Sequence, residues 1–141
     1  MLPGRKVVCV VDDDSLMLKS VRRLLEGEGY SVVTFARPGE SLDYMERNSV
    51  PLAILDIWME QMTGIELLAH LCARSPRTRV IFVTGREDRA AQAMVMQAGA
   101  FGFLIKPFKD NEFLAMVQRA LGDSAGEGCQ AMPTREGGAV C

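Results

Sequence analysis

The sequence has a single histidine, His70, and its four cysteines, Cys9, Cys72, Cys129 and Cys141, form no C-x-x-C pair. A metal site built from several histidines or from paired cysteines is therefore excluded. We expect Cys9 and Cys72 to be buried thiols and the other two to lie in a C-terminal tail. Unpaired thiols of this kind are typical of a reducing cytoplasm.

Long apolar runs and an excess of charge are also absent. No run approaches the roughly 20 residues that a membrane helix needs, and the net charge of -2 gives no overall attraction to nucleic acid. Residues 1–6 carry some positive charge, but the apolar run behind them stops at Asp12, which makes a poor signal peptide. We therefore expect a cytoplasmic chain that does not enter a membrane or bind nucleic acid directly.

Short apolar runs alternate with amphipathic segments along most of the 141 residues, a length typical of one domain. The apolar runs predict five strands, at Val7–Val11, Tyr30–Phe35, Leu52–Asp56, Arg79–Thr84 and Phe101–Ile105. A segment with helical spacing follows each of them. Five strand–helix repeats predict an α/β fold with a doubly wound parallel sheet and helices on both faces.

Several residues predict where the helices begin. Asp14 or Ser15 can cap the first helix, and Thr63 and Glu66 have the spacing of a capping box. The fourth helix is expected over Glu87–Ala98, with Ala91, Met94, Val95 and Ala98 on its buried side, and Asp110 is a possible cap for the fifth.

Chemically active residues end four of the five predicted strands. Asp12 and Asp13 follow the first strand and Asp56 ends the third, which is its neighbour in a doubly wound sheet. Two carboxylates about 4 Å apart repel each other by roughly 4 kcal/mol at an effective dielectric constant of 20, so the cluster calls for a cation. Because its ligands are oxygen atoms only, Mg²⁺ fits best.

The other two strand ends supply the hydroxyl of Thr84 and the ammonium of Lys106. A divalent cation, an ammonium and a hydroxyl around one carboxylate are typical of a site that transfers an anionic group. Phosphoryl transfer needs charge neutralisation and a nucleophile in line with the leaving group. The carboxylate of Asp56 can be that nucleophile and form an acyl phosphate.

Five short motifs, in this order and spacing, resemble the receiver domain of two-component response regulators over about residues 5–122. They are Val11-Asp12-Asp13-Asp14, Asp56-Ile57-Trp58-Met59 with Met62-Thr63-Gly64, Val83-Thr84-Gly85, Gly99-Ala100 and Lys106-Pro107-Phe108. The resemblance implies strand order 2-1-3-4-5. It also implies a receiver domain over 1–122, followed by a flexible tail or linker stub over 123–141.

The resemblance implies a role for each matching residue. Asp56 corresponds to the phosphoacceptor, and Asp12, Asp13, Asp56 and the backbone carbonyl of Trp58 correspond to the Mg²⁺ ligands. Thr84 corresponds to the switch hydroxyl and Lys106 to the lysine that pairs with the phosphoryl group. In the same family Phe103 matches an aromatic residue that rotates inward on activation, and the bond before Pro107 is cis.

The implied partner is a sensor histidine kinase, whose phosphohistidine donates to Asp56. The face made by the fourth helix, fifth strand and fifth helix then changes its affinity for a partner, such as a second receiver in a homodimer. Such a domain is a phosphoacceptor switch, not an enzyme, although it assists its own phosphorylation and dephosphorylation. The tail could be a natural end or lead to an output domain that binds DNA.

Two departures from the family concern the lifetime of the phosphoryl group. Glu60 stands where the family usually has proline, and Trp58 is bulky for its position. We hypothesise that Trp58 and Arg86 shield the phosphoryl group from water and that the charge of Glu60 affects the site.

Three other interpretations compete with the receiver domain. Asp12-x-Asp14 resembles the motif of haloacid-dehalogenase-type phosphatases, which usually have a longer core. A degenerate receiver that acts only as an interaction module is disfavoured by the complete set of polar strand ends. A nucleotide-binding domain is disfavoured because the turn after the first strand is acidic and has no Gly-rich loop.

Overall fold

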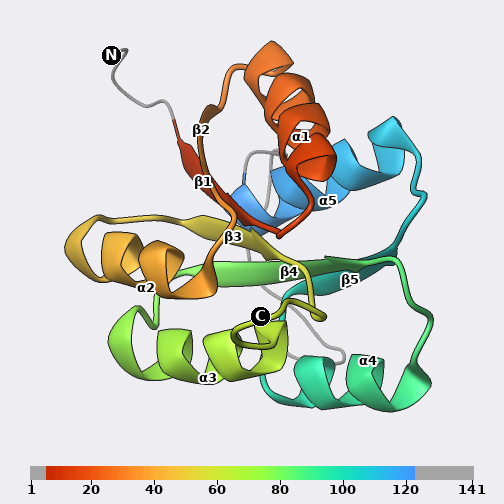
Figure 1. The fold of residues 1–141 in the computed structure, drawn as a ribbon. Helices are drawn as coiled ribbons and strands as arrows, with labels where there is room; N and C mark the ends of the chain where they lie inside the picture. The colour runs from red at the N-terminus through yellow and green to blue at the C-terminus, as the bar shows by residue number, and fades with distance from the viewer. Residues whose placement is uncertain (1–5, 123–141) are drawn as a thin grey trace.

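A computed structural model describes residues 6–122. Five strands alternate with five helices, as the sequence predicts (Figure 1). The elements are β1 (Val7–Val11), α1 (Ser15–Gly27), β2 (Ser31–Phe35), α2 (Pro38–Arg47), β3 (Leu52–Leu55), α3 (Gly64–Arg74), β4 (Arg79–Thr84), α4 (Arg89–Gln97), β5 (Gly102–Ile105) and α5 (Asp110–Leu121). The predicted tail over 123–141 lies outside the described residues.

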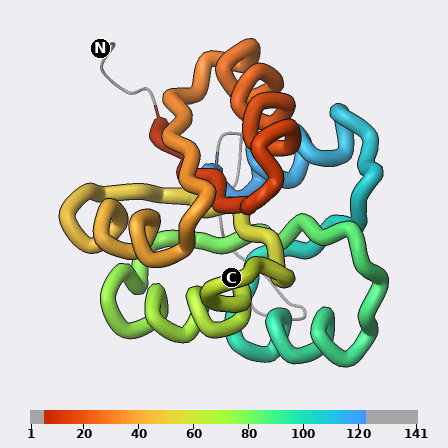
Figure 2. The backbone as a smooth tube through the Cα atoms, in the orientation of Figure 1, coloured from red at the N-terminus to blue at the C-terminus, as the bar shows by residue number. Residues whose placement is uncertain are grey.

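The strands form one parallel sheet in the order β2-β1-β3-β4-β5, which confirms the predicted fold. Helices α1 and α5 cover one face of the sheet, and α2, α3 and α4 cover the other (Figures 1 and 2). In the register of β1 and β3, Val11 lies beside Leu55. The residues that follow these two positions, Asp12 and Asp56, therefore leave the sheet at the same edge.

Each face of the sheet has its own hydrophobic core, because the strands are apolar on both sides. The core under α2, α3 and α4 is built around Phe82, Leu55, Leu67, Leu71 and Val95. The core under α1 and α5 is built around Phe113, Leu25, Val21, Ile54 and Val117. Burial of a side chain of this size contributes about 1.5–3 kcal/mol, so both cores stabilise the sheet that carries the polar side chains at its edge.

Side-chain caps fix the starts of three helices. Asp14 caps α1 by accepting hydrogen bonds from the backbone N–H groups of the first turn, and Asp88 caps α4. Thr63 and Glu66 form the predicted capping box at α3. Since Asp88 is the cap, α4 begins at Arg89 and not at Glu87.

Two other details differ from the sequence predictions. The cap position of α5 is Lys109, which makes no side-chain cap hydrogen bond, and Asp110 is the first residue inside the helix. Met94 and Ala98 were expected on the buried side of α4, but Met94 is 53% exposed and Ala98, which follows the helix as its C-cap, is exposed too. Ala91 and Val95 are the buried residues of α4, because this short helix turns only a narrow stripe toward the sheet.

The two described cysteines are both free, but only Cys9 is buried. Cys72 lies on the exposed side of α3, so the prediction that it is buried is wrong. The helical period allows Leu68 and Leu71 to face the core and leaves Cys72 outside. Among residues 6–122, no helix combines the length and the apolar character that crossing a membrane requires.

Candidate functional site

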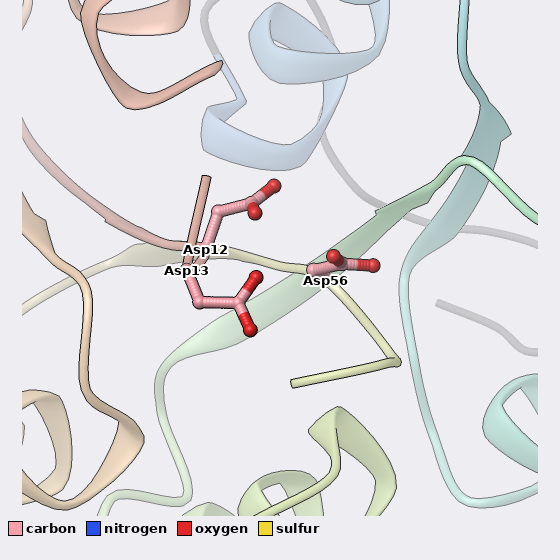
Figure 3. A group of neighbouring side chains, drawn as sticks. All are labelled: Asp12, Asp13 and Asp56. Atoms are coloured by element: carbon pink, nitrogen blue, oxygen red, sulfur yellow. The ribbon is translucent and has the colours of Figure 1, made fainter. Parts of the chain in front are cut away.

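Three carboxylates meet at the carboxyl edge of the sheet. Asp12 and Asp13 follow β1, Asp56 follows β3, and one oxygen of each lies within 4.8 Å of the others (Figure 3). The backbone N–H of Asp56 donates to the carbonyl of Val11 at 3.1 Å, which continues the pairing of the two strands up to the site. The predicted clustering of these three residues is thus confirmed.

Burial differs sharply within the cluster. Asp12 is 1% exposed and Asp56 is 8% exposed, whereas Asp13 is exposed to solvent. A hydrogen bond from the backbone N–H of Asp14 to Oδ1 of Asp12, at 2.9 Å, holds the most buried carboxylate in place. The carboxylate of Asp14 accepts the hydrogen bonds that cap α1, which agrees with a capping role and not with a role as metal ligand.

Lys106 reaches this cluster from the far end of the sheet. It follows β5, which is separated from β3 by β4, and its backbone N–H donates to the carbonyl of Thr84 at 2.8 Å. The ammonium Nζ lies 3.0 Å from Oδ2 of Asp12 and 3.8 Å from Oδ2 of Asp56. The predicted cis bond between Lys106 and Pro107 is present.

The environment of Asp56 raises the pKa of its carboxyl group above the usual value. Burial is the main cause, and the negative charge of Asp12 adds to it. The charge of Lys106 and backbone hydrogen bonds from Trp58 and Ile57 act in the opposite direction. The surroundings of Asp56 therefore disfavour its ionised form, and a bound cation would favour it.

Thr84 is fully buried at the end of β4, the strand next to β3. Its Oγ1 accepts a long hydrogen bond of 3.4 Å from the backbone N–H of Arg86. Oγ1 is the acceptor in this bond, so the hydroxyl of Thr84 can also donate a hydrogen bond to an anionic oxygen nearby.

Trp58 and Arg86 lie against each other beside the site. Cζ of Arg86 is 4.7 Å from the centroid of the Trp58 ring, and the backbone N–H of Trp58 faces Oδ1 of Asp56 at 3.4 Å. The indole Nε1 of Trp58 is buried and has no hydrogen-bond partner among the described residues. Glu60 is exposed on the same loop.

Phe103 is half-buried on β5 and packs against the core under α4. This position agrees with a packing role.

Sequence reasoning missed how Gly64 supports the acceptor. A Cβ atom added to Gly64 would meet the carbonyl oxygen of Asp56 and lie 2.7 Å from Cε1 of Phe82. The backbone N–H of Gly64 donates to the carbonyl of Ile57 at 2.7 Å. The start of α3 therefore packs closely against the acceptor loop. The only sequence signal for this packing was the place of Gly64 in the motif Met62-Thr63-Gly64.

The donor set fits a hard divalent cation. Three carboxylates provide oxygen ligands, and no histidine or cysteine of the described chain joins the group. Mg²⁺ prefers ligands of this kind and usually keeps several waters. The part of the Trp58 carbonyl as a further ligand stays a prediction.

Comparison with known proteins gives a consistent picture. The family model described as "Response regulator receiver domain" matches residues 8–118. The DNA-binding transcriptional regulator NtrC of Escherichia coli is 37% identical over 117 residues, which is 83% of this chain and 25% of NtrC. The chain thus spans about a quarter of that relative's length.

Solved structures agree in fold. A CheY-like response regulator receiver domain protein from Methanospirillum hungatei superimposes with a TM-score of 0.81 at 32% identity, covering 85% of this chain and 96% of that chain. The beryllofluoride-activated NtrC4 receiver domain dimer gives a TM-score of 0.79 at 30% identity, with 83% and 97% covered.

Proposed function

The chain belongs to the response regulator receiver family, and from this premise we propose that it is a Mg²⁺-dependent phosphoacceptor switch. A sensor histidine kinase is the donor, and Asp56 is the acceptor. The observation that carries the proposal is the meeting of Asp12, Asp13, Asp56 and the ammonium of Lys106 at one sheet edge. In this proposal the chain is a switch and not an enzyme. Its own residues nevertheless assist its phosphorylation and its dephosphorylation.

The proposed transfer replaces an N–P bond with an O–P bond. An oxygen of Asp56 attacks the phosphorus of a phosphohistidine, the bond from phosphorus to the imidazole breaks, and an acyl phosphate forms on Asp56. Asp12, Asp13 and the Trp58 carbonyl would hold Mg²⁺ together with Asp56. When bound, Mg²⁺ neutralises charge on the phosphoryl oxygens.

The ammonium of Lys106 and the hydroxyl of Thr84 supply the remaining groups of the proposed site. Lys106 is already within 3.8 Å of Asp56, so its ammonium can pair with the new phosphoryl group. Thr84 can donate its hydroxyl proton to a phosphoryl oxygen, because the bond from Arg86 uses only a lone pair of Oγ1. Both contacts stabilise negative charge in a partly buried place, where they are stronger than in water.

Movement of Thr84 and Phe103 is the proposed link from the site to the partner surface. Thr84 is the last residue of β4, and Phe103 lies in the neighbouring strand β5. The adjoining face is formed by α4, β5 and α5. In these elements the exposed large apolar side chains are Met94, Met96 and Ile105. Because the NtrC4 receiver is a dimer in its activated form, a homodimer through this face is part of the proposal.

The proposal extends to the lifetime of the phosphoryl group. The stacked side chains of Trp58 and Arg86 would cover the acyl phosphate and slow the approach of water. Glu60, exposed on the same loop, would place a negative charge at the rim of the site. These three residues are the proposed tuning residues.

A longer protein is the proposed context. NtrC is a DNA-binding transcriptional regulator about four times the length of the matched region, so an output domain beyond residue 122 could bind DNA. The chain itself has no role in nucleic-acid binding in this proposal. A cytoplasmic location agrees with the free thiols of Cys9 and Cys72.

Beryllofluoride with Mg²⁺ provides a direct test of the switch, because it mimics a phosphoryl group on a carboxylate. Backbone amide signals of α4, β5 and α5 are expected to shift in the wild type, together with those of Thr84. The variant Asp56→Asn should show no such shifts. Shifts confined to the metal site would contradict the proposed link to the partner face.

A further inference from the structure

A cleft of about 450 Å³ opens at the edge of the sheet opposite the three carboxylates. The loop 48–51 before β3 and the loop 75–78 before β4 form it, together with the last residues of α2 and α3. Oγ1 of Thr78 donates to the carbonyl of Val50 at 2.7 Å, which joins the two loops. The volume is within the range of ligand sites, about 300–1,000 Å³, so the cleft can hold a short segment of chain.

The lining of this cleft is positively charged. It includes Arg47, Arg74 and Arg77, and Glu46 is the one acidic residue among the described residues that line it. Glu46 pairs with Arg74 at 3.3 Å, whereas Arg47 and Arg77 have no ion pair or hydrogen-bond partner for their side chains within residues 6–122. The carbonyl ends of α2 and α3 also face this edge and carry about half a negative charge each. Three guanidinium groups, one carboxylate and two helix ends leave a charge of about +1, so the cleft favours an anionic occupant.

The end of α5 is held at the same edge of the sheet. Nζ of Lys6, the residue before β1, donates to the carbonyl of Leu121 at 2.6 Å. Nη1 of Arg79, the first residue of β4, donates to the carbonyl of Ala120 at 2.9 Å. Strand β3 lies between β1 and β4, and Arg79 directly follows Thr78 of the cleft. The chain therefore leaves α5 next to the cleft.

The sequence that follows α5 begins with an acidic segment. Residues 123–127, which lie outside the described residues, read Asp-Ser-Ala-Gly-Glu. They contain two carboxylates and no basic residue, and the next basic residue is Arg135. Five extended residues span about 17 Å, several times the spacing of about 4.8 Å between neighbouring strands. The segment thus has the charge and the length to reach a basic cleft at the edge where α5 ends.

We propose that this cleft binds the acidic segment 123–127 of the same chain. The two carboxylates of the segment pair with Arg47 and Arg77, the two guanidinium groups of the cleft that lack a partner among the described residues. Exposed ion pairs are individually weak, so the segment is bound reversibly and salt weakens its binding. A domain joined after this segment would be held at the edge of the sheet opposite the carboxylates. The inference does not depend on Asp56 being the phosphoacceptor.

Cleavage of the full chain by a glutamate-specific protease tests the inference. The bonds after Glu127 and Glu136 are both Glu–Gly bonds, and only the first belongs to the proposed segment. In the wild type it should be cut about fivefold more slowly than the second, because the protease cuts only the released segment. In Arg47→Gln/Arg77→Gln the two rates should agree within about twofold. Arg23→Gln, at an exposed position on α1, is the matched control and should keep the wild-type ratio.

Backbone amide signals in NMR give a second measurement, with substitutions that leave the described residues intact. The signals of Ser49 and Thr78 in the cleft should shift between the wild type and Asp123→Asn/Glu127→Gln, but not in Glu136→Gln. Unmoved signals in the double variant would overturn the inference, as would equal cutting of the two bonds in the wild type. Protection that rises with protein concentration would show that a second copy supplies the segment, which would contradict binding within one chain.

Discussion

The guanidinium of Arg86 lies over the indole ring of Trp58, with Cζ 4.7 Å from the ring centroid, directly after the buried end of β4 and beside the acceptor loop. A contact of this type at a partly exposed site contributes about 0.5–1 kcal/mol. It joins the loop after β3 to the loop after β4, so it spans the two segments that carry Asp56 and Thr84.

Loss of either partner is expected to shorten the lifetime of phosphorylated Asp56. If the stack shields the acyl phosphate, Trp58→Ala and Arg86→Ala should each speed hydrolysis about two- to fivefold, which corresponds to the same 0.5–1 kcal/mol. Decay of the phosphorylated mass over time measures the rate. Arg89→Ala, which removes an exposed arginine at the start of α4, should leave it unchanged. An unchanged rate in Trp58→Ala would remove the shielding hypothesis.

Gly64 is expected to tolerate no side chain. In Gly64→Ala the new Cβ would press on the carbonyl of Asp56 and the ring of Phe82, so the acceptor loop must move. We expect a loss of about 1–3 kcal/mol in the free energy of unfolding and slower phosphorylation. Gly39→Ala is the control, because no atom lies within 4 Å of its Cβ position in α2. Equal urea midpoints for the two variants would contradict the packing described for Gly64.

The stability of the metal-free chain should depend on the charge of Asp56. Since burial raises the pKa of this carboxyl group, the folded chain holds the proton more tightly than the unfolded chain. The favourable contribution of the protonated group is present below the unfolded pKa, near 4, and is lost as the pH rises through the folded value.

Asp56→Asn is therefore expected to unfold at a higher temperature than the wild type at pH 7.5 in EDTA, by roughly 2–4 °C. The difference should vanish below about pH 4. Asp43→Asn, an exposed position on α2, controls for the change in net charge. A lower melting temperature for Asp56→Asn at pH 7.5 would show that ionised Asp56 stabilises the fold instead.

The two described thiols should differ in reactivity. Burial raises the pKa of Cys9 to about 12, so it carries almost no thiolate at pH 8 and is closed to reagents. Cys72 is exposed on α3 and should react within minutes. Iodoacetamide labelling followed by peptide mapping distinguishes the two. Labelling of Cys9 in the native chain at the rate of Cys72 would contradict its buried position in β1.

Strand positions could be predicted from sequence because each strand is apolar on both faces. β1 and β4 begin and end at the predicted residues, and the topology places Asp12 beside Asp56 as expected. Helix details were harder to predict. The cap position of α5 is Lys109 and not Asp110, and the burial of Met94 and Cys72 depends on which side of each helix meets the sheet.

The least predictable part of the site was the pairing of Lys106. Its place at the end of β5 predicted a cation near the carboxylates, but not that Asp12 would be its closer partner. That choice follows from the length of the lysine side chain and the depth of each carboxylate, which are three-dimensional properties. Trp58 and Arg86 were both expected near the site, but the sequence did not predict that the guanidinium would lie over the indole ring.

Intact-mass spectrometry tests the central claim most directly. The wild type and Asp56→Asn would be incubated with Mg²⁺ and either acetyl phosphate or phosphoramidate, whose N–P bond resembles that of phosphohistidine, with EDTA as a control. We predict that the wild type gains one phosphoryl group when Mg²⁺ is present, and that Asp56→Asn gains none. A wild type that binds Mg²⁺ but gains no mass with either donor, or an equal gain in Asp56→Asn, would contradict the assignment of Asp56 as the phosphoacceptor.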